Sequence, residues 1–171
     1  MNLKRRCKTI KKVAVVMGSA SDLPLVQKTI DALKEFGVPF EAHVYSAHRT
    51  PEIAAGFAKS ARQNGFGVLI AAAGMAAHLA GALAANTTLP VIGIPIKSKA
   101  LDGMDALLST VQMPSGIPVA AVAIDGGVNA ALLAVEILAI EDENLAAMLD
   151  AKRRENAAEA LKKDAELNKI I

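Results

Sequence analysis

Residues 67–78 read GVLIAAAGMAAH, in which the wholly apolar residues 67–73 lead into a turn at Gly74. A short, continuous apolar run is typical of a strand buried on both faces of a parallel sheet. The Ala-rich residues 76–85 that follow predict a short helix. The same succession of strand, turn and helix recurs at residues 13–37 and 40–65 on the amino-terminal side. This alternation decides the fold class, because it implies a parallel sheet covered by helices.

The whole chain continues this pattern. The predicted strands cover residues 13–17, 40–45, 67–73, 90–96 and 117–124, and the predicted helices cover residues 21–37, 50–65, 76–85, 102–111, 128–140 and 144–168. Right-handed crossovers favour the strand order 2-1-3-4-5, which is a flavodoxin-like, three-layer α/β fold with an extra carboxyl-terminal helix. The second strand is polar enough for an edge. The fifth is an apolar edge, so we expect the last helix or another subunit to cover it.

The composition favours burial of apolar surface between copies of the chain. Hydrophobic residues make up 53% of the 171 residues, and the mean hydropathy is +0.34. Residues 67–85 are long enough to span a membrane, with only His78 strongly polar. However, this stretch is rich in Ala and Gly and has no Trp or Tyr at either end. We therefore predict one catalytic domain, residues 13–171, that assembles with itself and does not enter a membrane.

The charge is concentrated at the amino terminus. Residues 1–12 hold six of the 19 basic residues and none of the 17 acidic ones, so the remainder is mildly acidic. This distribution argues against nucleic acid as the main ligand, and we expect residues 1–12 to form a disordered basic arm. The arm contains the single cysteine, Cys7, and lacks the apolar segment of a secretory signal. One unpaired cysteine fits the reducing cytoplasm.

Three loops carry the candidate chemistry: residues 17–22, 46–51 and 73–79. Each follows a predicted strand, and such loops meet at the carboxyl edge of a parallel sheet. In the first loop, the Gly18 turn and the hydroxyls of Ser19 and Ser21 suit a phosphate at a helix amino terminus. Asp22 can accept hydrogen bonds from ribose hydroxyls. The alternative is an ordinary helix cap made by Ser21 or Asp22.

The second loop offers a base and a cation side by side. Arg49 can bind a phosphate through two hydrogen bonds, and His48 can transfer protons near neutral pH. The alternative is a loop held by local salt bridges. We expect His43 to lie solvated in the edge strand without a role. No cysteine or carboxylate cluster accompanies these histidines, so we predict no metal site.

The third loop combines Gly74 with His78. Gly74 lets a planar ligand approach the backbone closely. A lone histidine such as His78, in a short apolar helix, is more often a structural residue. A nucleophilic serine lacks support, because no G-x-S-x-G elbow is present.

These loops occur together with further distinctive strings, at residues 89–95, 107–114, 116–120 and 129–134. Ser-Ala-His-Arg-Thr-Pro at residues 46–51 and Gln-Met-Pro at residues 112–114 are highly specific. From residue 13 to residue 140 the chain resembles the class I N5-carboxyaminoimidazole ribonucleotide mutases of bacterial purine synthesis.

The resemblance implies a flavodoxin-like homo-octamer that acts on a small ribonucleotide without metal or organic cofactor. It implies that His48 is the acid and base, that Ser19, Asp22 and Arg49 bind the ribonucleotide, and that the Gly74 loop lines the base and carboxylate pocket. The full set of candidate substrate-binding residues is Ser19, Ser21, Asp22, Ser46, Arg49, Gly74, Met75 and His78. A transient hand-over of substrate from an ATP-dependent carboxyaminoimidazole ribonucleotide synthetase is an additional partner hypothesis.

Two positions depart from the family pattern. Met75 stands where many members have glycine, and Leu23 stands where many have tryptophan. A related class carboxylates aminoimidazole ribonucleotide directly with carbon dioxide and has lysine at the position of Arg49, so Arg49 and Pro51 favour the mutase. The direct carboxylase stays an alternative, as does a non-catalytic flavin or nucleotide carrier, because the fold is shared with flavodoxins.

Overall fold

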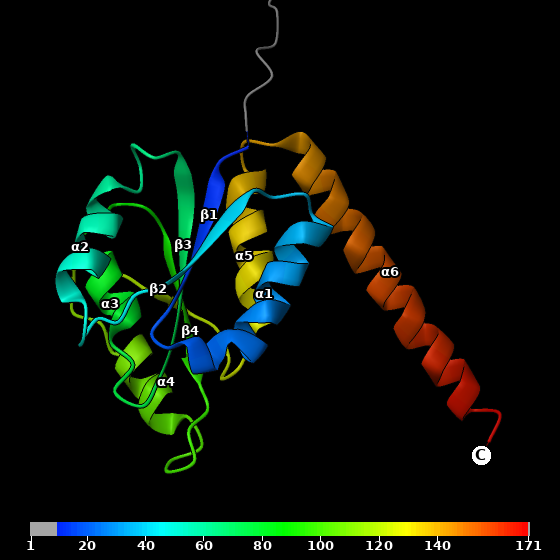
Figure 1. The fold of residues 1–171 in the computed structure, drawn as a ribbon. Coiled ribbons are helices and arrows are strands. Elements are labelled where there is room, and N and C mark those ends of the chain that lie inside the picture. The colour runs from blue at the N-terminus through cyan, green and yellow to red at the C-terminus, as the bar shows by residue number, and fades with distance from the viewer. Residues whose placement is uncertain (1–9, 171) are drawn as a thin grey trace, which may run out of the picture.

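The computed structural model describes residues 10–170, which form a parallel sheet between two layers of helices (Figure 1). The strands are β1 (Lys12–Met17), β2 (Phe40–Val44), β3 (Phe66–Gly74), β4 (Val91–Ile96) and β5 (Ala120–Ala121). They lie in the order β2-β1-β3-β4-β5, and every ladder is parallel. The predicted fold class and strand order are confirmed.

The helices divide between the two faces of the sheet. They are a 3-10 turn η1 (Ala20–Asp22), α1 (Leu23–Glu35), α2 (Pro51–Ser60), α3 (Leu79–Ala84), α4 (Met104–Val111), α5 (Gly127–Ala139) and α6 (Glu143–Leu167). Helices α1 and α5 cover one face, and α2, α3 and α4 cover the other (Figure 1). Because β1 and β3 are central and buried on both faces, alternate residues of each strand feed two separate cores.

The register brings the ends of four strands level with one another. Met17, near the end of β1, is in register with Val44 of β2 and Ala72 of β3. Gly74 of β3 is in register with Ile96 of β4. The loops after β1, β2, β3 and β4 therefore emerge at one edge of the sheet, as predicted for the first three.

Several predicted elements are shorter in the structure. β5 is a two-residue strand rather than residues 117–124, because Pro118 has no N–H to donate to a ladder. After β5, Val122 still donates to Gly93 O, and the chain then turns through Asp125 at φ 58. Helix α2 ends at Ser60 and α3 begins only at Leu79.

The last helix extends away from the body, as the orange and red ribbon in Figure 1 shows. Its first half packs on α5 and α1, where Arg153 lies 2.7 Å from Glu136 and Lys152 lies 2.8 Å from Glu35. The residues after Glu155 are exposed. We expected this helix or another subunit to cover the edge strand β5. In the structure, α6 packs on α5 instead.

The amino-terminal boundary can be placed from Lys12, which belongs to β1. Its Nζ lies 2.6 Å from Glu41 Oε1 of β2. The basic arm was predicted over residues 1–12. Residues 1–9 lie outside the described part of the chain, whereas Lys12 belongs to the sheet. Between residues 10 and 170, no helix combines the length and apolar character needed to cross a membrane.

Candidate functional site

The four loops at the carboxyl edge enclose a cavity of about 580 Å³. Seventeen residues line it, namely Gly18, Ser19, Ser21, Asp22, Ser46, Ala47, His48, Arg49, Ala73, Gly74, Met75, Ala76, His78, Leu79, Ile96, Lys97 and Ser98. All nine residues that the sequence singled out for catalysis or substrate binding are among them. The prediction that these residues lie together at the carboxyl edge of the sheet is therefore confirmed, as far as their position is concerned.

The first loop presents its polar groups to this cavity. Ser19 Oγ accepts from the backbone N–H of Ser21 at 3.3 Å and from the Ser21 hydroxyl at 2.8 Å. Ser19 thereby caps the turn η1, whereas Asp22 makes no side-chain capping bond to α1. The ordinary helix cap by Ser21 or Asp22 is thus wrong, and the Asp22 carboxylate is left at the cavity wall.

The environment of Asp22 alters its acidity. Partial burial raises the pKa of the Asp22 carboxyl above its ordinary value, against the opposing effect of hydrogen bonds from Ser21 and Ser19. A buried carboxylate is stabilised when it accepts additional hydrogen bonds. Hydroxyl groups of a ligand that donate hydrogen bonds to the Asp22 carboxylate would therefore stabilise its charged form.

The second loop is a closed turn. Ser46 N donates to Thr50 Oγ1 at 2.9 Å, Thr50 N donates to Ser46 O at 2.8 Å, and Arg49 N donates to Ser46 Oγ at 3.1 Å. Three bonds across five residues fix the backbone that carries His48 and Arg49. Backbone and hydroxyl hydrogen bonds hold this loop, and within residues 10–170 neither His48 nor Arg49 forms the salt bridge of the alternative reading.

Two contacts join the loops to one another. Arg49 Nη2 donates to Gly18 O at 2.9 Å, which ties the second loop to the first. The rings of His48 and His78 meet edge to face with their centroids 4.2 Å apart, which ties the second loop to the third. A guanidinium and two imidazoles therefore converge from three separate segments of the chain.

The third loop contains a strained residue. Met75 has φ 57, a left-handed conformation that favours glycine, and its side chain is exposed. Many members of the family that the sequence resembles have glycine at this position. Methionine here therefore carries a conformational free-energy cost at the rim of the cavity. His78 occupies the N-cap position of α3 and so lies just before that helix, not within it as predicted.

The comparisons with known proteins identify the family of the chain. The family model described as AIR carboxylase matches residues 12–159. The chain belongs to the AIR carboxylase family. Relatives named N5-carboxyaminoimidazole ribonucleotide mutase include one from Pyrococcus horikoshii, 61% identical over 75% of this chain and 73% of that protein, and one from Bacillus subtilis, 54% identical over 87% and 93%. The crystal structure of Treponema denticola PurE has a TM-score of 0.82 at 30% identity, covering 91% of this chain and 98% of that one.

A fourth loop, after β4, also borders the cavity, although the sequence analysis did not single it out. Lys97 and Ser98 line the cavity from that side. The same rule that selected the first three loops applies to a predicted strand ending at Ile96, next to the third strand. The signal was therefore present in the sequence, but the loop has no histidine and no glycine directly after the strand to draw attention to it.

His43 lies in the edge strand β2 as expected, but the expectation that it is solvated is wrong. Its ring stacks on Tyr45 at 4.9 Å and contacts Phe57 of α2 at the same centroid distance, so it is packed rather than solvated. Tyr45 Oη lies 3.1 Å from His43 Nδ1, and Glu41 Oε2 lies 3.5 Å from His43 Nε2. Phe57 of α2 covers this side of the edge strand.

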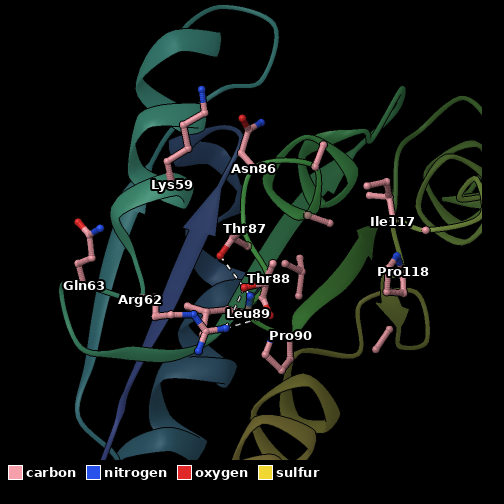
Figure 2. A pocket seen from close by; sticks show the side chains of 15 residues that line it. Lys59, Arg62, Gln63, Asn86, Thr87, Thr88, Leu89, Pro90, Ile117 and Pro118 are labelled. Atoms are coloured by element: carbon pink, nitrogen blue, oxygen red, sulfur yellow. Dashed lines mark hydrogen bonds between the residues drawn. The ribbon is translucent and has the colours of Figure 1, made fainter.

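A larger cavity, of about 1000 Å³, lies at the opposite end of the sheet (Figure 2). It is bounded by the ends of α2 and α3 and by the chain before β4 and β5. Arg62 Nη2 donates to Thr88 O at 3.1 Å and to Thr88 Oγ1 at 3.0 Å, so this cation serves to hold a loop. Within residues 10–170, no three histidine, cysteine or acidic side chains gather as a metal site would require.

Proposed function

We propose that the protein is an N5-carboxyaminoimidazole ribonucleotide mutase. It moves the carboxylate from the exocyclic nitrogen to carbon 4 of the same imidazole, in purine biosynthesis. The observation that carries this proposal is the meeting of His48 and Arg49 with the Gly18 and His78 loops at one cavity. That geometry occurs in a chain 54% identical to the Bacillus subtilis mutase over 93% of the latter's length.

Substrate binding is assigned to the three loops. Arg49 and the hydroxyls of Ser19, Ser21 and Ser46 hold the phosphate, because a guanidinium and hydroxyl donors match its oxygens. Asp22 accepts from the ribose hydroxyls. The Gly74 loop, with Met75 and His78, borders the base. Holding the imidazole ring in a fixed orientation relative to His48 accelerates the reaction.

His48 is assigned the proton transfers. Protonation of the carbamate nitrogen lets its bond to carbon break, with the electron pair staying on nitrogen and carbon dioxide departing. Carbon 4 of the resulting aminoimidazole then attacks carbon dioxide and forms the new carbon–carbon bond. The proton on carbon 4 must leave to restore aromaticity. A single imidazole that first donates and then accepts a proton balances both steps.

Carbon dioxide must stay in the cavity between these steps. Small side chains line the wall beside the third loop, including Ala73, Gly74 and Ala76. They allow the wall to come into close contact with the ring. Exclusion of water also strengthens the electrostatic contacts of the bound anions.

The decisive assay supplies the N-carboxylated ribonucleotide without ATP or bicarbonate. We expect purified protein to form the carbon-carboxylated product, and we expect the His48→Asn variant to bind substrate without forming it. Product formed only from aminoimidazole ribonucleotide plus bicarbonate would instead assign the direct carboxylase, the activity that the family description names. Failure of both reactions would contradict the proposal.

We also propose a homo-octamer. Helix α4 presents an exposed apolar stripe made by Met104, Leu108 and Val111, which are 52%, 50% and 48% exposed. These residues lie at the i, i+4 and i+7 spacing of one helix face. Burial between subunits would remove this stripe from water. Light scattering should give about eight times the 17.7 kDa chain mass, and a monomer would contradict the proposal.

We further propose that residues 13–171 work as one catalytic domain in the cytoplasm, with no metal or organic cofactor. Turnover should survive dialysis against EDTA.

We propose that an ATP-dependent carboxyaminoimidazole ribonucleotide synthetase hands over the labile carbamate. The product yield should rise when that synthetase is present at equal carbamate concentration, and an unchanged yield would contradict the hand-over.

A further inference from the structure

The loop between β4 and α4 brings a cation to the cavity that the proposed roles leave unused. Lys97 lines the cavity directly after Ile96, the residue in register with Gly74. Its backbone N–H donates to Asp125 Oδ1 at 2.9 Å, which fixes the start of the loop. Its Nζ lies 3.1 Å from Asp102 Oδ1, and its side chain is 59% exposed. The ammonium is thus held near the cavity and remains open to a ligand.

The strand order separates this cation from Arg49. The Arg49 guanidinium is bonded to Gly18 at the end of β1, and Lys97 follows β4, two strands further along the sheet. Since neighbouring strands lie about 4.8 Å apart, the ends of β1 and β4 stand roughly 10 Å from each other. The paired rings of His48 and His78 reach the third loop, which lies between them. The cavity therefore has a cation at each end and imidazoles in the middle.

We propose that Lys97 binds the carboxylate of the substrate and product, whereas Arg49 binds the phosphate. This inference rests on the proposed function. A ribonucleotide with its phosphate at Arg49 and its ring at His48 directs the group attached to that ring toward β4. An ammonium at that end complements the carboxylate charge.

The neighbouring residue supports a polar ligand at this wall. Ser98 lines the cavity, and its Oγ is buried without a hydrogen-bond partner in the described part of the chain. A buried hydroxyl without a partner is unfavourable, so a ligand oxygen that accepts from it restores the lost bond. Lys97 and Ser98 therefore both line this wall of the cavity.

The chemistry predicts which kinetic constant Lys97 controls. The carboxylate is anionic in both substrate and product, whereas the carbon dioxide between them is neutral. An ammonium at this end stabilises the two bound ground states at least as well as the intermediate. Such uniform binding lowers KM without raising kcat. The ion pair with Asp102 shares the lysine charge and moderates this ground-state stabilisation.

The test compares two ligands that differ only in the carboxylate. Calorimetry measures binding of the carbon-carboxylated product and of uncarboxylated aminoimidazole ribonucleotide to wild type, Lys97→Gln and Lys99→Gln. We expect Lys97→Gln to weaken product binding roughly tenfold, the loss expected for one charged hydrogen bond, with the uncarboxylated ligand unaffected. Lys99→Gln is the matched control, because Lys99 is an exposed lysine of the same loop that does not line the cavity.

Each other result overturns a stated claim. Equal weakening of both ligands by Lys97→Gln would assign Lys97 to the phosphate or to folding, and weakening of neither would leave it no role in binding. Either result overturns the inference while the proposed function stands. Wild-type protein that binds neither ribonucleotide would overturn the proposed function as well. A rise in KM with constant kcat in Lys97→Gln is the matching kinetic outcome.

Discussion

The two ends of the sheet hold cavities of opposite character. The cavity at the carboxyl end is about 580 Å³ and gathers two imidazoles, a guanidinium and a carboxylate from separate loops. The cavity at the other end is about 1000 Å³, and its arginine is bonded to the chain itself (Figure 2). The difference teaches that convergence of reactive groups, rather than size, locates a site. Helix amino termini and loop glycines occur at the carboxyl end because strands lead into helices there.

The largest effect is expected at His48. His48→Asn removes the group that transfers both protons, so turnover should fall by about 10²–10⁴-fold while ribonucleotide binding persists. Gln63→Ala, in the larger cavity, is the matched control and should leave turnover unchanged. Steady-state kinetics and calorimetry on both variants check this. A control variant as inactive as His48→Asn would break the distinction between the two cavities.

A smaller effect is expected at Arg49. Arg49→Ala removes a charged donor from the phosphate end and the bond to Gly18 O. Binding of the ribonucleotide should weaken by roughly ten- to a hundredfold, the range for hydrogen bonds to charged groups. Titration with ligand measures this loss. An unchanged affinity would remove Arg49 from phosphate binding.

At the other end of the sheet, Arg62 should matter to stability alone. Arg62→Ala deletes two hydrogen bonds to Thr88, both exposed, so the free energy of unfolding should fall by about 1 kcal/mol. Activity per folded molecule should stay at the wild-type level. Urea unfolding and the mutase assay together test this. Lost turnover at unchanged stability would make the larger cavity a functional site.

The smallest effect concerns Asp22 and pH. Its pKa is raised by burial, so the folded state binds a proton more readily than the unfolded chain, and this carboxyl lowers stability as pH rises through its titration range. Asp22→Asn should therefore raise Tm slightly at neutral pH, and the gain should vanish in acid, where the carboxyl is protonated in both states. Ribonucleotide binding should weaken at the same time. A Tm gain that persists unchanged in acid would contradict this account.

The site could be predicted from the sequence because its residues follow strands whose order is predictable. Ser19, Arg49 and His78 lie on loops that the β-α alternation places at one edge, and they line one cavity. Lys97 obeyed the same rule and was overlooked, since a single lysine in a polar loop carries no distinctive pattern. The packing of His43 was mispredicted because α2 determines which side of the edge strand is covered.

The sequence by itself determined the layers, the strand order and the edge at which the candidate residues gather. It could do so because hydrophobic periodicity and crossover handedness are local rules. The tertiary structure alone decided that β5 is two residues long, that α6 packs on α5, and that the rings of His48 and His78 touch. Those features depend on side chains that meet across distant segments, and no spacing along the chain encodes such contacts.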